Sequence, residues 1–189
     1  MARARPRATY DDALQVPEHM VAEIIDGELY ATPRPASPHA FAAAGIGRDL
    51  FGPFHREPGG PPAPGGWWIL FEPELHLNSD LIVPDLAGWR HEHMARVPSV
   101  AYFTQPPDWV CEIVSPTTAA TDRVRKMRVY AREQVAHAWL VDPLAKTLEV
   151  YHLEQGRWVV AATYSGDERA CAEPFDAIEL QLSRWWLQE

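Results

Sequence analysis

Two acidic residues interrupt apolar runs of the sequence. Asp85 follows Pro84 in LIVPDLAGW, and Glu112 lies in DWVCEIVS. Both runs are expected to form buried or half-buried strands, in which an unpaired carboxylate is costly. A divalent cation offsets this cost, because Mg²⁺ prefers carboxylate oxygens and water and usually takes one or two protein carboxylates. Asp85 and Glu112 are therefore the candidate ligands of Mg²⁺ or Mn²⁺.

Lys126 is the candidate partner of these two acids. It lies in the second turn of a helix expected to begin at Asp122, from which its side chain can point back toward the strand end. A bound metal can activate water and stabilise charge on a phosphate, and a nearby ammonium can stabilise the transition state. Asp85, Glu112 and Lys126 together predict a catalytic site for phosphodiester cleavage.

The helix that carries Lys126 is basic, although the chain as a whole has a net charge of −9. The acidic balance excludes a surface that is basic all over and argues against strong non-specific attraction to polyphosphates. Any nucleic-acid site must then be locally basic. The helix is interpreted as such a site for phosphate contacts. Its other cations are Arg123, Arg125, Arg128 and Arg132.

Three segments in a fixed order carry a family resemblance: VPDLAGW, PDWVCEIVSPTTAATDRVRKMRVYAREQV and AWLVDP. They resemble the putative restriction endonuclease domain family of small prokaryotic proteins, a branch of the PD-(D/E)xK nuclease superfamily. The resemblance extends upstream to AEIIDGELYATPRP and His39 and covers about residues 23–151. It implies an α/β, restriction-endonuclease-like fold, in which helices flank a mixed β-sheet and an N-terminal β-hairpin precedes them.

The resemblance also implies roles for single residues. Asp85 is the acid of the PD element, Glu112 is the second acid, and Lys126 is the lysine. In the usual superfamily pattern the lysine follows two residues after the second acid, but Val114 stands there. The sequence resembles the branch in which the lysine has moved to the following helix. The implied activity is that of a Mg²⁺-dependent DNA endonuclease, and the implied partners are DNA and a second copy of the chain in a homodimer.

Two other functions stay open at this point. A catalytically inactive nuclease-fold binding or regulatory module is favoured by the acidic net charge and by the missing strand lysine. Hydrolysis of a different phosphoester is the third hypothesis, because metal chemistry does not by itself name the substrate.

Several further residues have competing interpretations. His39 is interpreted as a surface or capping residue, with an accessory role at the site as the alternative. Glu23 and Glu28 flank a hairpin turn, where a structural role weighs at least as much as catalysis. The tryptophan pairs are interpreted as packing or a dimer contact, with base stacking as the alternative. These pairs are Trp67, Trp68, Trp185 and Trp186.

The elements that position these residues follow from periodicity and turn signals. Helices are expected at 9–16, 39–55 and 122–134, and hairpins at 21–32 about Asp26-Gly27 and at 147–164 about Gln155-Gly156. Residues 67–77 and 81–89 are expected to form an antiparallel pair of strands, with Asp85 inside the second. Further strands are expected at 108–114 and 136–141, and the tail from Asp176 is expected to pack back on the domain.

Length and composition indicate a single domain over residues 1–189, since 47% of the residues are apolar. The Pro/Gly-rich stretch 57–66 is expected to be an exposed loop. Cys111 and Cys171 are too few for a disulfide scaffold and suggest a reducing cytoplasm. No stretch approaches the length of a membrane span, so the protein is expected to be soluble.

Overall fold

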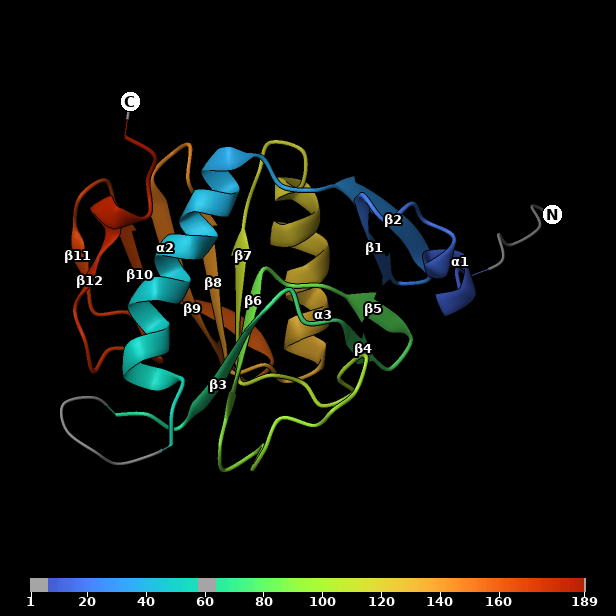
Figure 1. Ribbon diagram of the computed structural model, residues 1–189, viewed down its shortest axis with the longest axis horizontal. Coiled ribbons are helices and arrows are strands. Elements are labelled where there is room, and N and C mark those ends of the chain that lie inside the picture. The colour runs from blue at the N-terminus through green and yellow to red at the C-terminus, as the bar shows by residue number, and fades with distance from the viewer. Residues whose placement is uncertain (1–6, 58–63, 189) are drawn as a thin grey trace.

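The computed structural model describes residues 7–57 and 64–188. Two main β-sheets with flanking helices form the molecule (Figure 1). The larger sheet has the order β10-β9-β8-β7-β6-β3, and the smaller has the order β2-β1-β5-β4. The predicted α/β fold with a mixed sheet and an N-terminal hairpin is confirmed.

The larger sheet contains β3 (Trp67–Phe71), β6 (Leu86–Arg90), β7 (Trp109–Ile113), β8 (His137–Asp142), β9 (Thr147–Glu154) and β10 (Arg157–Ser165). The smaller sheet contains β1 (Met20–Ile25), β2 (Glu28–Pro33), β4 (Leu75–Leu77) and β5 (Asp80–Ile82). The remaining elements are α1 (Tyr10–Leu14), α2 (Ser37–Phe54), the π-helical turn η1 (Thr121–Lys126), α3 (Met127–Arg132), β11 (Arg169–Ala170), β12 (Leu180–Gln181) and the 3-10 turn η2 (Leu182–Arg184).

Both predicted hairpins form about residues with positive φ. Asp26 and Gly27 have φ of 53° and 83° between β1 and β2, and Gln155 and Gly156 have φ of 49° and 75° between β9 and β10. Positive φ at both central residues matches the right-handed twist of paired strands, so these turns fix the register. The two hairpin predictions are confirmed.

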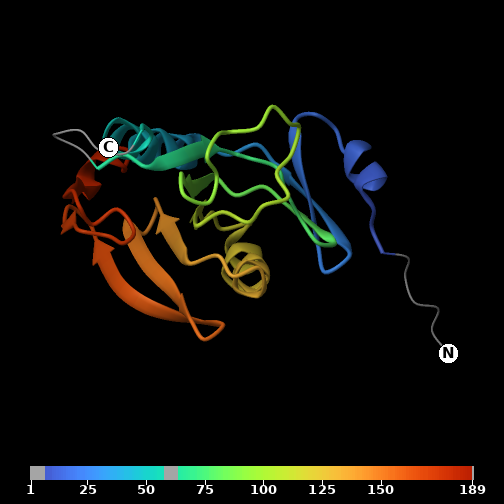
Figure 2. The ribbon, with the colours of Figure 1, turned by 90° about the horizontal axis from the view of Figure 1, so that it is seen from below.

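The strand β7 is an inner strand of the larger sheet, and α2 and α3 cover the two faces of this sheet (Figure 2). Trp109, Cys111 and Ile113 share one hydrophobic cluster with α2, whereas Val110 and Val114 share another with α3. This alternation follows from the period of two in a strand. β7 runs parallel to β8, and η1 with α3 forms the crossover between them.

The prediction of two continuous strands at 67–77 and 81–89 is wrong. Each segment divides between the sheets: β3 pairs with β6 in the larger sheet, and β4 pairs with β5 in the smaller. Pro73 and Pro84 stand in the breaks, where proline cannot donate to a ladder, and Glu72 has a φ of 43°. As a consequence Asp85 lies in the bend before β6, where the chain passes between the sheets, and not within a strand.

The C-terminal segment packs on the α2 side of the larger sheet, as expected. Trp67, Trp185 and Trp186 are buried in the core there, and Gly45 of α2 leaves room for Trp185, because a Cβ at Gly45 would lie 3.0 Å from its ring. Trp68 donates its Nε1–H to the carbonyl of Met94. These contacts are packing contacts, not a base-stacking surface.

Other predicted elements agree with the structure to within a few residues. α2 begins two residues before the predicted start, with a proline in its first turn. The predicted loop at 57–66 falls mostly on residues 58–63, which lie outside the described part of the chain. Over the described residues, none of the helices has the length and apolar character needed to cross a membrane.

Candidate functional site

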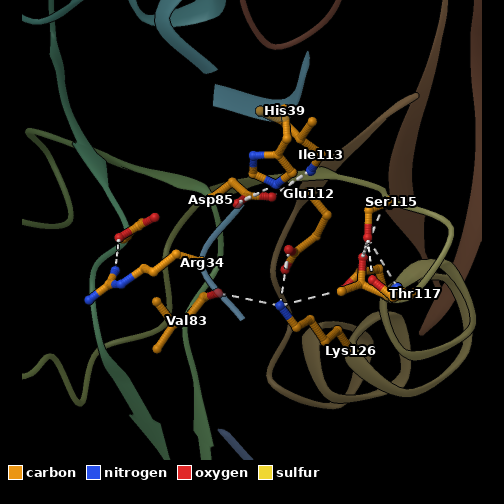
Figure 3. Close-up of polar contacts among 12 residues, drawn as sticks. Arg34, His39, Val83, Asp85, Glu112, Ile113, Ser115, Thr117 and Lys126 are labelled. Atoms are coloured by element: carbon orange, nitrogen blue, oxygen red, sulfur yellow. Dashed lines mark hydrogen bonds and ion pairs between the residues drawn. The ribbon is translucent and has the colours of Figure 1, made fainter. Parts of the chain in front are cut away.

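Lys126 lies at the centre of a buried group of acids (Figure 3). Its Nζ is 2.8 Å from Glu23 Oε1, 3.1 Å from Glu112 Oε2 and 3.5 Å from Asp122 Oδ1. The ammonium also donates to the carbonyl of Val83 at 3.3 Å. Three carboxylates from three parts of the chain therefore share one cation. The sequence predicted the proximity of Lys126 and Glu112, but not that of Glu23 and Asp122.

Local structure explains why Glu112 meets the helix. Glu112 shares the parity of Val110 and Val114, so its side chain leaves β7 on the face that α3 covers. Lys126 and Tyr130 are four residues apart and lie on the same helix face. The Tyr130 hydroxyl donates to Glu112 Oε1, so each oxygen of this carboxylate has a donor from the helix.

The turn that carries Lys126 is π-helical from Thr121 to Lys126. Single π-helical turns within α-helices occur frequently at functional sites. Asp122 and Lys126 both project from this turn into the buried group. The predicted helix was continuous and began at Asp122, so its irregular start is a feature that sequence reasoning missed.

Asp85 joins the group from the bend before β6. Leu86 pairs with Cys111, so Asp85 lies next to the end of β7, and its Oδ2 accepts a hydrogen bond from the Ile113 N–H at 2.6 Å. Its Oδ1 is 3.0 Å from Nε2 of His39 in the first turn of α2. His39 is thus not a free surface or capping residue, and its accessory placement beside Asp85 corrects the leading interpretation.

Glu23 is the site residue whose role the sequence left undecided. It lies in β1, is 4% exposed, and its Oε1 accepts from the Val83 N–H at 2.9 Å as well as from Lys126. An acid within the apolar run VAEII gave the same signal that singled out Glu112. Glu28, by contrast, is exposed and pairs with Arg125 at 3.2 Å.

The electrostatics of the group are dominated by burial and by an excess of acid. Burial raises the pKa of Glu112 well above its usual range, although Lys126 opposes the shift. Burial also raises the pKa of Asp122. Burial alone would lower the pKa of Lys126, but the surrounding carboxylates reverse this and hold its pKa well above the ordinary lysine value. The ammonium therefore stays charged.

A pocket of about 390 Å³ opens above these residues. The largely buried charged residues of its lining, here called its floor, are Glu23, Asp85, Glu112, Asp122 and Lys126. Its walls come from the β1–β2 hairpin, the N-terminal turn of α2, and the loops that follow β7 and β8. The predicted residues thus line one concave surface.

Three of the four helix arginines form ion pairs with acids of the same molecule. Arg123 makes two close contacts with Glu149, at 2.7 and 2.8 Å, and Arg125 lies over the Tyr30 ring at 5.0 Å while pairing with Glu28. Arg132 contacts Asp26, Asp80 and Glu133. The charges of these arginines are matched by acids of the same molecule, whereas Arg128 is exposed, so the phosphate-contact role of this helix stays a prediction.

Comparison with known proteins adds a family. Residues 8–183 match the model of the Uma2 family, described as putative restriction endonuclease. The chain belongs to the Uma2 family. No curated protein matches the Uma2 chain. A solved structure titled as a putative nuclease belonging to DUF820 from Anabaena variabilis ATCC 29413 is similar, with a TM-score of 0.72 and 21% identity over 95% of this chain and 99% of that one. At this identity the likeness shows the fold.

The donor set of this Uma2 chain fits a divalent cation. Over residues 7–57 and 64–188 no three His, Cys, Asp or Glu side chains already surround one metal position. Mg²⁺, however, commonly binds through one or two carboxylates and water. Four carboxylates line the floor with one ammonium, and two of them have a raised pKa. This acid excess is the environment that a doubly charged cation would stabilise.

Proposed function

We propose that the chain is a metal-dependent DNA endonuclease in which Asp85 and Glu112 hold Mg²⁺ or Mn²⁺. The observation that carries this proposal is the convergence of both acids with Lys126 on the floor of one pocket, with Nζ 3.1 Å from Glu112 Oε2. Membership of a family of putative restriction endonucleases supports the same reaction. We also infer that the chain acts as one domain, because the hairpin contributes Glu23 to the site.

The side chains have separable tasks in this proposal. Asp85 and Glu112 would hold the cation, which when bound would supply charge to activate water and to stabilise a phosphate. Lys126 remains protonated and presents its ammonium to the developing negative charge. His39 and the Ile113 N–H fix the two oxygens of Asp85, and Tyr130 fixes Glu112. Such supporting contacts orient ligands and tune their basicity.

Plasmid cleavage and calorimetry test the proposal together. The protein is incubated with supercoiled plasmid and Mn²⁺, and Mn²⁺ binding is titrated calorimetrically. Asp85→Asn and Glu112→Gln are expected to abolish both signals, whereas Glu92→Gln is the control, since Glu92 is 68% exposed and outside the pocket. Cleavage by Asp85→Asn and Glu112→Gln at the wild-type rate would overturn the assignment.

A binding or regulatory module without catalysis is the second candidate. Lys126 and Tyr130 already satisfy both oxygens of Glu112, which is the observation in its favour. This alternative predicts no Mn²⁺ heat and no hydrolysis of plasmid. The homodimer expected from the family resemblance is part of the first proposal only, because cleavage of both strands is served by two related sites.

A further inference from the structure

We propose that the pocket receives an unpaired nucleotide of a DNA strand, and not the backbone of an intact duplex. This inference rests on the proposed function and names its substrate class. The floor is deeply set: Glu112 is 2% exposed and Lys126 is 5% exposed. The pocket volume of about 390 Å³ lies in the range of small-ligand sites, roughly 300–1,000 Å³. A nucleotide that has left the stacked helix can enter a pocket of this size and bring its phosphate to the floor.

The walls of the pocket are suited to the flat faces of a base and a sugar. They are mainly apolar, and several stand exposed at the mouth, including Leu144 at 61% exposure. Aromatic side chains stack on unpaired bases of any sequence, and aliphatic side chains and prolines pack against the faces of unstacked bases. The apolar lining includes Tyr30, Pro33, Pro35, Pro38, Pro116 and Leu144.

The charges around the mouth of the pocket also favour an unpaired nucleotide over a duplex. Among the described residues that line the pocket, the lysines and arginines are Lys126, which is buried, and Arg34, which is exposed and paired with Glu72 at 3.0 Å. A duplex-binding surface typically makes about 6–10 phosphate contacts, each with a cation. The net charge of −9 opposes such binding. Packing against one or a few nucleotides, and not backbone neutralisation, must then supply the affinity.

Binding and cutting are measured separately on three fluorescent DNA probes of one sequence: a single strand, a blunt duplex and a duplex with a single-stranded tail. Anisotropy with Ca²⁺ is expected to show at least about ten-fold tighter binding of the single strand than of the blunt duplex. The slope of log affinity against log salt is expected to be about −0.7 to −1.4, corresponding to one or two phosphates. With Mn²⁺, cleavage is expected in the single strand and in the tail.

A wall variant locates the binding. Leu144→Ser is expected to weaken single-strand binding about five-fold, because the substitution removes apolar surface that the nucleotide would cover. Leu14→Ser is the matched control, because Leu14 is the same residue type, is 60% exposed and lies on α1 outside this pocket. Equal effects of the two substitutions would overturn the placement of the nucleotide.

The outcomes separate this inference from the proposed function. If the duplex is cleaved as fast as the single strand and Asp85→Asn abolishes this cleavage, the result would support the nuclease activity. It would overturn the proposal that the pocket receives an unpaired nucleotide. If Leu144→Ser weakens single-strand binding but none of the probes is cleaved, the result would support the pocket assignment and overturn the nuclease activity. A steep salt slope with preference for the duplex would overturn the inference directly.

Discussion

Lys126 Nζ lies 2.8 Å from Glu23 Oε1, and this buried ion pair joins the helix behind the larger sheet to a strand of the smaller one. The same Glu23 oxygen accepts from the Val83 N–H, which precedes the bend at Asp85. The N-terminal hairpin is therefore a part of the site and holds the ammonium within reach of Glu112.

Glu23→Gln should show whether Glu23 positions the Lys126 ammonium or only stabilises the fold. Glutamine keeps the size and an accepting oxygen for Val83 and Lys126, but it removes one negative charge next to the ammonium. Activity is expected to fall about 10–100-fold, as for other residues that orient a site. Steady-state cleavage assays should show the loss in kcat with a smaller change in KM. Glu28→Gln is the control, and unchanged activity of the Glu23 variant would contradict the assignment.

Lys126→Met should be less stable by about 3–5 kcal/mol at neutral pH, because three buried carboxylates lose their shared cation. The deficit should shrink as the pH falls. A carboxyl with a raised pKa binds its proton more readily in the folded state, so protonation of Glu112 and Asp122 favours folding of the variant. Urea unfolding at several pH values measures this. The exposed Lys146→Met is the control, and a deficit independent of pH would argue against the charge mechanism.

Tyr130→Phe should remove the donor to Glu112 Oε1 while keeping the buried ring. Loss of this buried hydrogen bond, which leaves Glu112 Oε1 without its donor, is expected to cost about 1–3 kcal/mol. Tyr164→Phe provides the comparison, since its hydroxyl donates to the Cys171 carbonyl at an exposed position. Equal stability of the two variants in thermal and urea unfolding would indicate that the Tyr130 contact contributes little.

Arg123→Gln should make the protein less stable at neutral pH than at acidic pH, relative to the wild type. The hydrogen bond from Arg123 lowers the pKa of Glu149. A lowered folded pKa contributes stability that is present above the ordinary glutamate value and is lost as the pH falls through the folded pKa. The difference in unfolding free energy should therefore be largest near pH 7 and vanish in acid. Arg128→Gln, at an exposed position of the same helix, should show no such trend.

Local sequence signals predicted much of the fold, because turn residues act locally. Asp26-Gly27 and Gln155-Gly156 identified both hairpins, and the apolar run around Glu112 identified the central strand. The division of 67–77 and 81–89 between two sheets was missed, although Pro73 and Pro84 marked both breaks. Apolar content alone does not say to which sheet a segment belongs.

The site was predicted only in part, because sequence signals are local and do not show which distant segments pack together. Asp85, Glu112 and Lys126 do converge, as their types and order indicated. His39 and Glu23 approach from α2 and β1, and their proximity depends on packing of distant segments. Tyr130 and Asp122 each lie four residues from Lys126, a spacing that brings helical side chains onto one face and marks both as neighbours of the lysine. The ion pairs of the helix arginines depend on acids elsewhere in the chain.

The sharing of Lys126 between Glu23 and Glu112 has a consequence for evolution and design. Replacing a buried ionic group as a whole by apolar residues of similar volume is often neutral or stabilising. A library randomised at Lys126 and at the three acids around it, Glu23, Glu112 and Asp122, and selected only for folding should therefore drift toward apolar combinations. Selection for the proposed DNA cleavage should retrieve the charged residues. Stability and the proposed cleavage of DNA would thus impose different demands on the same positions.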